Sequence, residues 1–150
     1  TNSGDGYSTT SYTEYGAVNR LAKTNKLPIL TCPDKEHDLY TVDSSKGNGA
    51  LTNPIGLMTA DEAAMAGMVN GYLNTLSYVY TGTWYWTMSP YNFSPSNSTS
   101  YVWRVSSSGN FYGYLVTSGN GVRPVINLKS DVEISGGIGT INDPFIVKTN

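Results

Sequence analysis

The residue types that carry out catalysis are scarce in this sequence. The single histidine, His37, lies between Glu36 and Asp38, and the single cysteine, Cys32, lies just upstream. A Ser–His–Asp or Cys–His arrangement needs a histidine held beside its nucleophile by a third group, and one histidine in a charged loop gives weak support for either. No pair of carboxylates lies in an apolar stretch of the kind that creates a general acid. We therefore expect no catalytic residues and no enzyme activity.

Patterns that bind metals or cofactors are equally weak. The acidic loop around Asp34 and Glu36 has the composition of a cation site, but such a site needs several oxygens in fixed geometry, and acidic loops are common without one. The glycine-rich stretch Gly136–Gly139 lacks the helix and the lysine that follow in a phosphate-binding loop. We expect no metal and no cofactor, and we expect Cys32 to be a half-buried structural thiol.

Composition and charge narrow the classes of partner. The chain has 150 residues, a net charge of −2, and nine Lys and Arg that are scattered rather than clustered. Nucleic-acid binding normally needs a basic stripe, so we expect no nucleic-acid partner. No apolar run approaches the roughly 20 residues of a membrane span, so we expect no direct membrane insertion by this segment. Only 13% of the residues are charged, and neutral polar residues and twelve tyrosines take their place.

The segment Tyr91–Asn120 has the composition of a binding surface. Eight Ser, four Asn, four Tyr and three Gly occur in it. Antibody binding loops use Tyr for rigid contact area and Ser, Gly and Asn for adaptable hydrogen bonds, although an ordinary solvated hairpin also favours Ser, Asn and Gly. Alternation within Tyr101–Val105 leaves open that Trp103 belongs to the core instead. The predicted ligand-binding residues are Tyr91, Asn92, Phe93, Asn97, Tyr101, Trp103, Tyr112 and Tyr114.

Two helices are predicted in the first half of the chain. Residues 1–10 show no periodicity and are typical of a flexible arm or linker. A capping box of Ser11 and Glu14 predicts a first helix that ends before Pro28. A second capping box, Thr59 with Glu62, starts a run of alanines that Gly67 or Gly71 should end.

The second half of the chain changes to the period of two that is typical of strands. An antiparallel meander after two helices predicts a single α+β domain over residues 11–150. The predicted strands are Leu27–Thr31, Leu39–Val42, Ser77–Tyr80, Thr83–Met88, Tyr101–Val105, Phe111–Val116, Val122–Leu128, Val132–Ile134 and Phe145–Val147.

Three stretches carry a resemblance to a known family. They are an aromatic strand with a Ser-Pro turn at Trp84–Pro90, a Gly-Val-Arg-Pro strand at Gly121–Ile126, and the start of the second helix at Pro54–Glu62. Together they resemble the C-type-lectin-like domains of bacteria and phages, over Ser11 to Val147. Asn19-Arg20-Leu21 and Thr31-Cys32-Pro33 are similar to a subgroup from gut Firmicutes, whose members often carry a prepilin-type segment before the domain.

The resemblance implies a C-type-lectin-like fold and a displayed recognition domain. Some family members are targets of diversity-generating retroelements, which vary the stretch that corresponds to Tyr91–Asn120. The Glu-Pro-Asn or Gln-Pro-Asp tripeptides of calcium-dependent sugar binding do not occur here, and no cysteine follows Cys32 to supply the chemistry of the formylglycine-generating enzyme. Neither of these two functions therefore carries over to this chain.

Three residues are predicted to be structural. Trp84 and Trp86 alternate with Tyr85, so the two tryptophan rings lie on one face of a strand. Burial of one such ring removes about 150–250 Å² from water, so we expect both tryptophans to be determinants of the fold rather than ligand contacts. Arg123 lies among apolar residues and should be largely buried and bonded to backbone or carboxylate oxygens.

The sequence thus predicts a non-catalytic recognition or adhesion domain. Its partner would be a protein or glycan on another cell or a phage, which places the domain outside the cell, on a cell surface or on a virion. Two alternatives remain: a pilin-like or filament subunit whose anchor helix lies upstream, and an enzyme of unknown type.

Overall fold

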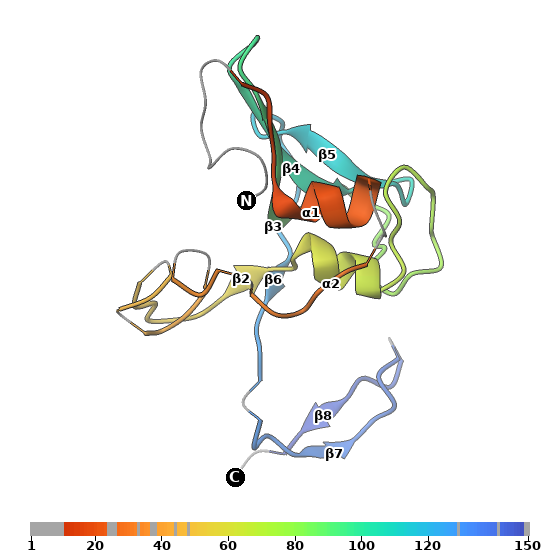
Figure 1. Ribbon diagram of the computed structural model, residues 1–150. Helices are drawn as coiled ribbons and strands as arrows, with labels where there is room; N and C mark the ends of the chain where they lie inside the picture. Colours follow the sequence, from red (N-terminus) through yellow and green to blue (C-terminus); the bar gives the residue numbers. More distant parts are fainter. Residues whose placement is uncertain are drawn as a thin grey trace.

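The computed structural model describes residues 11–23, 27–32, 34–36, 39–43, 45–47, 49–128, 130–140 and 142–148, and the predicted arm at 1–10 lies outside them. Short helices and antiparallel strands form a mixed α+β architecture, as the sequence predicts (Figure 1). In chain order the elements are β1 (Thr13–Glu14), α1 (Gly16–Val18), a π-helical turn (Asn19–Lys23), β2 (Gly56–Leu57), α2 (Ala60–Met65), β3 (Tyr85–Ser94), β4 (Thr99–Val105), β5 (Phe111–Leu115), β6 (Pro124–Val125), β7 (Ile134–Gly136) and β8 (Ile146–Val147).

A four-stranded sheet in the order β1-β3-β4-β5 organises the domain. The predicted hairpin of β4 and β5 is confirmed, and its register runs without a shift from Tyr101 opposite Leu115 to Val105 opposite Phe111. Strand β3 is longer than predicted, and its register to β4 shifts on both sides of Pro90. Proline has no N–H to donate to a ladder, so an irregularity at this position is the expected accommodation.

Two smaller sheets complete the architecture. Strand β6 pairs with β2, Val125 opposite Gly56 and Pro124 opposite Leu57. Strands β7 and β8 form a hairpin that lies apart from the main sheet, at the lower end of the chain as drawn in Figure 1. The predicted strand Val132–Ile134 is therefore displaced by two residues to become β7, and the predicted strand Phe145–Val147 is shortened to β8.

The first helix begins later than its predicted capping box. Thr13 and Glu14 form strand β1, opposite Phe93 and Asn92 of β3. Helix α1 begins at Gly16 after Tyr15, which makes no side-chain capping bond. The prediction of a helix from Ser11 is wrong because pairing with the edge of β3 satisfies the backbone groups that the capping box would have satisfied.

The second helix follows its prediction. Thr59 Oγ1 accepts a hydrogen bond from the Glu62 N–H at 3.1 Å, and the Glu62 carboxylate accepts one from the Thr59 N–H at 2.7 Å. The helix ends before Gly67, whose φ of 94° lies in the left-handed region that favours glycine. A contact from far along the chain supports the start of the helix, because Ser89 Oγ accepts a hydrogen bond from the Ala60 N–H at 2.9 Å.

Three predicted strands do not form. Residues 27–31 and 39–42 are irregular, and Ser77–Tyr80 is a turn in which the Tyr80 N–H donates to the Ser77 carbonyl at 3.0 Å. Ser77 Oγ donates to the Ala66 carbonyl at 2.7 Å, so this turn holds the end of α2. A short apolar run predicts burial but does not decide between a strand and a packed loop.

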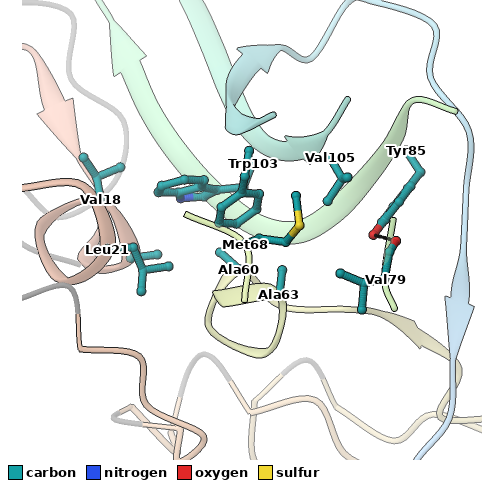
Figure 2. Packing of buried hydrophobic residues seen from close by; sticks show 11 residues of the cluster. Val18, Leu21, Ala60, Ala63, Met68, Val79, Tyr85, Trp103 and Val105 are labelled. Atoms are coloured by element: carbon teal, nitrogen blue, oxygen red, sulfur yellow. Dashed lines mark hydrogen bonds between the residues drawn. The ribbon is translucent and has the colours of Figure 1, made fainter. Parts of the chain in front are cut away.

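The core lies between the sheet and the two helices (Figure 2). Trp103 is fully buried, stacks on Phe111 with a centroid separation of 4.6 Å, and meets the edge of Tyr91 at 4.7 Å. Val18 and Leu21 approach it from the first helical segment. The buried cluster consists of Ala17, Val18, Leu21, Ala60, Ala63, Met68, Val79, Tyr85, Trp103, Val105 and Phe111.

The packing of Tyr91 predicts a steric requirement at Gly113. A Cβ added at Gly113 would lie 2.1 Å from Cγ of Tyr91, whereas one added at Gly119 would meet no atom within 4 Å. We expect Gly113→Ala to lower the free energy of unfolding by about 1–3 kcal/mol and Gly119→Ala to change it by less than about 0.5 kcal/mol. Guanidinium chloride denaturation followed by tryptophan fluorescence measures both, and equal midpoints for the two variants would contradict this account of the core.

Candidate functional site

The strands of the main sheet have two chemically different sides. Trp103, Val105 and Phe111 point into the core, so the residues next to them along each strand point the other way. The register places Trp86 opposite Arg104 and Arg104 opposite Tyr112, which brings these side chains to the same side. We call this side the outer face and define it by five residues: Trp84, Trp86, Arg104, Tyr112 and Tyr114.

Arg104 is the centre of the outer face. Its guanidinium carbon lies 3.8 Å from the ring centroid of Trp84, 3.3 Å from that of Tyr114 and 5.1 Å from that of Tyr112. These rings leave only 5% of Arg104 exposed. Because a guanidinium is attracted to aromatic faces and is weakly hydrated, this arrangement stabilises a cation that has been withdrawn from water.

The hydrogen-bond partners of Arg104 are neutral. Its Nη1 donates to Asn120 Oδ1 at 3.2 Å and its Nη2 donates to the Tyr112 hydroxyl at 2.7 Å. Its Nε and the Nδ2 of Asn120 are buried and have no hydrogen-bond partner in the described part of the chain. No ion pair joins Arg104 to a carboxylate of the described residues, whereas Arg20, Lys23 and Lys148 each have one. The positive charge of Arg104 is therefore left without an anionic partner among the described residues.

Two of the predicted ligand-binding residues lie on the outer face. Tyr112 and Tyr114 share this side of β5, with centroids 6.2 Å apart and rings nearly perpendicular. Both are half-buried, and each has one side against Arg104. They lie on the side opposite Phe111, because no bulge interrupts the register of β4 and β5.

The other predicted ligand-binding residues do not join them. Trp103 is part of the core, which is the alternative that its strand alternation had left open, and Tyr91 packs against the core from β3. Asn92 and Phe93 are buried where β3 pairs with β1 and β4. The expectation that these four residues lie on one exposed face is therefore corrected: the sheet needs their side chains to cover its inner side and its β1 edge.

The last two predicted residues lie near the turn between β3 and β4. Asn97 is exposed within that turn, and its carbonyl accepts a hydrogen bond from Thr99 Oγ1 at 2.9 Å. Tyr101 is half-buried and lies opposite Asn92 and Leu115 in the register. Alternation puts Tyr101 on the same side of β4 as Trp103, away from the outer face. The single binding face predicted from the sequence is thus divided between two sides of the sheet and a turn.

The predicted structural residues are also placed differently from expectation. Trp84 and Trp86 do share one side of the strand, but the core side is that of Tyr85 and Thr87, and 37% of Trp84 is exposed. Alternation shows which rings lie on the same side of a strand but not which side packs against the helices. Here the side of Tyr85 packs against them, so the two tryptophans are less buried than expected. Trp84 nevertheless has a structural contact, because its ring covers Arg104.

Arg123 is held by the backbone, as predicted, although it is half-buried rather than largely buried. Its Nη1 donates to the Val79 carbonyl at 2.8 Å, and its guanidinium lies 5.5 Å from the Tyr85 ring. Gly121 brings this strand against β3, with reciprocal backbone bonds to Trp84 and Trp86. A Cβ on Gly121 would lie 2.8 Å from the Trp84 carbonyl oxygen, so the close approach requires glycine.

Sequence reasoning missed Arg104 and Asn120. A usable signal was present, because the alternation that sends Trp103 inward sends Arg104 outward between aromatic neighbours. A second signal is the absence of any Asp or Glu from Ala63 to Ser130, which leaves the basic residues of that stretch without acidic neighbours in sequence. Asn120 could not be found in this way, because it lies in the segment between β5 and β6 and reaches Arg104 only in the folded chain.

A cleft of about 520 Å³ lies elsewhere, between the first helical segment, the segment around residues 29–57 and β3. Arg20 and Asp61 face it, joined by two hydrogen bonds of 3.1 and 2.7 Å, and Asp61 also accepts from the Ile29 N–H at 2.9 Å. Cys32 borders it and donates to the Asp34 carbonyl at 3.2 Å. These polar groups form hydrogen bonds with the protein itself, so we interpret their role in the cleft as structural rather than as ligand binding.

Two further observations concern metal-ligating side chains and long apolar helices. In the described ranges no three His, Cys, Asp or Glu side chains come close enough to hold a metal ion, and His37 and Asp38 lie outside the described residues. No helix within those ranges has the length and apolar character needed to cross a membrane.

The fold and the outer face define a small α+β domain with an aromatic surface built around one arginine. The chain belongs to the family DUF6273, a domain of unknown function, whose match spans residues 10–130. That span takes in the whole main sheet and ends before the β7–β8 hairpin. No curated protein and no solved structure matches the chain.

The environment of Tyr85 predicts a dependence of stability on alkaline pH. Burial raises the pKa of Tyr85 above its ordinary value of 10.0, and nearby Arg123 only partly offsets this. The folded state therefore favours the neutral phenol, and this contribution to stability is complete below pH 10.0 and is lost as the pH rises through the raised pKa.

We expect Tyr85→Phe to flatten the fall in stability above pH 10.0. The same variant should be less stable at neutral pH by about 0.5–1.5 kcal/mol, because it loses the 2.7 Å hydrogen bond to the Val79 carbonyl. Denaturation midpoints across this range measure both effects. Parallel curves for the parent and the variant would show that Tyr85 does not carry the pH dependence.

Proposed function

We propose that this chain is a non-catalytic recognition domain that binds its partner through the outer face. The observation that carries the proposal is the cluster around Arg104, in which Trp84, Tyr112 and Tyr114 surround a buried cation while Trp84 remains partly exposed. Trp, Tyr and Arg are the residue types that dominate binding energy in interfaces. Their convergence on one side of a rigid sheet favours binding over catalysis.

The placement of this cluster supports the proposal in a second way. The inner sides of β4 and β5 are filled by core residues, so the strands that carry Arg104 and the tyrosines are held in place by packing. A pre-ordered surface loses little conformational entropy when a partner binds. The Ser- and Asn-rich turns at both ends of the sheet add adaptable hydrogen-bonding groups around it.

We further propose that the fold is C-type-lectin-like and that the domain is displayed outside the cell, on a cell surface or on a virion. Support comes from the motif residues that carry the resemblance, because contacts link them. Ser89 of the aromatic strand caps the start of α2, and Gly121 of the Gly-Val-Arg-Pro strand lies against Trp84. The partner would be a protein or glycan on another cell or phage, with variation between family members concentrated in Tyr91–Asn120.

One observation favours a second candidate function, that of a filament subunit. The β7–β8 hairpin exposes 50% of Ile134, 72% of Ile138, 62% of Phe145 and 56% of Ile146. An isolated two-stranded hairpin is marginally stable in water, so apolar side chains on both of its faces favour a contact with another surface. A second copy of the chain would supply that surface in a filament.

The recognition proposal predicts that outer-face substitutions weaken binding while the fold is retained. Trp84→Ser combined with Tyr114→Ser should weaken binding of the labelled domain to a glycan array and to a panel of intact bacterial cells by about 30-fold or more. Tyr72→Ser with Tyr78→Ser, which changes two exposed tyrosines away from the outer face, is the matched control.

Circular dichroism checks that each of these variants folds. If the first variant unfolds, Trp86→Ser repeats the test without removing a ring that covers Arg104. Unchanged binding by a folded outer-face variant, or no binding by the parent to any probe, would contradict the proposal.

The filament candidate predicts self-association through the hairpin. The parent should form concentration-dependent oligomers, and Ile138→Ser combined with Phe145→Ser should return it to a monomer, because the apolar area available for contact is reduced. Sedimentation velocity over a concentration series measures this. A parent chain that stays monomeric throughout the series would remove the candidate.

A further inference from the structure

We propose that the outer face binds the carboxylate of an acidic sugar, with Arg104 and Asn120 as the anion-binding groups. This inference rests on the proposed function and names the chemistry of its ligand. Three features of the structure lead to it: the uncompensated charge of Arg104, the hydrogen-bond donors without a partner beside it, and the partly exposed ring of Trp84 against it.

The charge of the sheet region is one-sided. From Ala63 to Ser130 the sequence contains Arg104, Arg123 and Lys129 but no Asp or Glu. Within the described residues the acidic side chains belong to the segments before and after this stretch, and none forms an ion pair with Arg104. In a setting withdrawn from water, an uncompensated cation attracts an anion more strongly than it would at an open surface.

The two hydrogen-bonding groups of this cluster that have no partner are both donors. Arginine can only donate, so the Asn120 side chain must turn its oxygen toward Nη1, and this leaves its Nδ2 as a donor without a partner. Arg104 Nε is a second such donor in the same cluster. A positive charge without a carboxylate partner, beside two buried donors without a hydrogen-bond partner, suits an anionic oxygen. A carboxylate offers two oxygens and can accept from a guanidinium in the bidentate geometry that arginine favours.

Access to Nη1 of Arg104 depends on Asn120, whose side-chain oxygen accepts from it. The rings of Trp84 and Tyr114 cover the two faces of the guanidinium, so a ligand approaches it along its edge. Asn120 occupies that edge from the segment between β5 and β6, outside the regular strands. A carboxylate therefore takes the place of the Asn120 oxygen at Nη1, and the asparagine turns so that its Nδ2 donates to the bound anion.

The surroundings favour a sugar over a peptide as the bearer of the carboxylate. Peptides commonly bind by adding a strand to a free sheet edge or by filling a groove. Strand β4 is hydrogen-bonded on both sides, to β3 and β5, so its backbone is not available for strand addition at Arg104. Trp84 remains 37% exposed, and an aromatic ring matches the apolar C–H face of a pyranose ring. A uronic acid unit carries both that face and the carboxylate.

The test compares an oligogalacturonate with a neutral galactan oligosaccharide of the same length by isothermal titration calorimetry. We expect the oligogalacturonate to bind and its affinity to fall as salt is raised, because the contact is ionic. The decisive variant is Asn120→Asp, which places a carboxylate beside Arg104 within the chain. It should bind the oligogalacturonate about 10- to 100-fold more weakly and melt at a higher temperature than the parent, because the internal carboxylate occupies the anion site.

Asn53→Asp is the matched control. It adds the same negative charge at an exposed position outside the outer face, and we expect it to leave both the binding of the oligogalacturonate and the melting temperature unchanged. If Asn120→Asp fails to fold, Arg104→Lys is titrated with the oligogalacturonate instead. Lysine keeps the positive charge but loses the bidentate geometry, so this variant should also bind more weakly than the parent.

Each remaining outcome contradicts the inference in a defined way. Equal binding of the charged and neutral oligosaccharides shows that the carboxylate is not recognised. Binding of poly-glutamate but not of the oligogalacturonate assigns the site to an acidic peptide. If neither binds while substitution of Trp84 and Tyr114 still removes binding to cells, the proposed function stands and this inference fails.

Discussion

The burial of Trp103 is the constraint on which the rest of this structure depends. The ring is fully enclosed by Phe111 on one side and the edge of Tyr91 on another, while Thr87 Oγ1 donates to its backbone carbonyl at 2.9 Å. An aromatic side chain of this size contributes a large apolar area, so a strand that carries it is held with one side toward the helices. That orientation decides the side on which every other residue of β4 lies, and through the register it decides the same for β3 and β5.

The outer face is a consequence of this orientation. Once Trp103 points inward, Arg104 must point outward, and the register sets Trp86 and Tyr112 beside it. An arginine that is only 5% exposed and has no carboxylate partner would be costly in an apolar setting, and the electron-rich faces of Trp84 and Tyr114 reduce that cost. The same packing that stabilises the fold therefore holds a positively charged, donor-rich group in one geometry at the surface.

The motifs that stand out in the sequence act at the junctions between elements. Ser89 joins the aromatic strand to the start of α2, and Gly121 allows its strand to lie directly against β3. Arg123 then reaches back to the Val79 carbonyl beside the Tyr85 ring. These contacts join elements that long stretches of chain separate. Each residue either bonds to a backbone group of a distant element or allows that element to approach closely.

The sequence by itself determined the features that depend on neighbours along the chain. The capping box of Thr59 and Glu62, the end of α2 before Gly67 and the hairpin of β4 and β5 all form as predicted, because their hydrogen bonds close within a few residues or across one turn. Only the tertiary structure decided that residues 13–14 join a sheet, that the Tyr85 side of β3 is the buried one, and that Asn120 meets Arg104. Alternation groups side chains onto a common face, but the choice of the face that becomes core, and the pairing of groups far apart in sequence, depend on packing between elements that no local pattern contains.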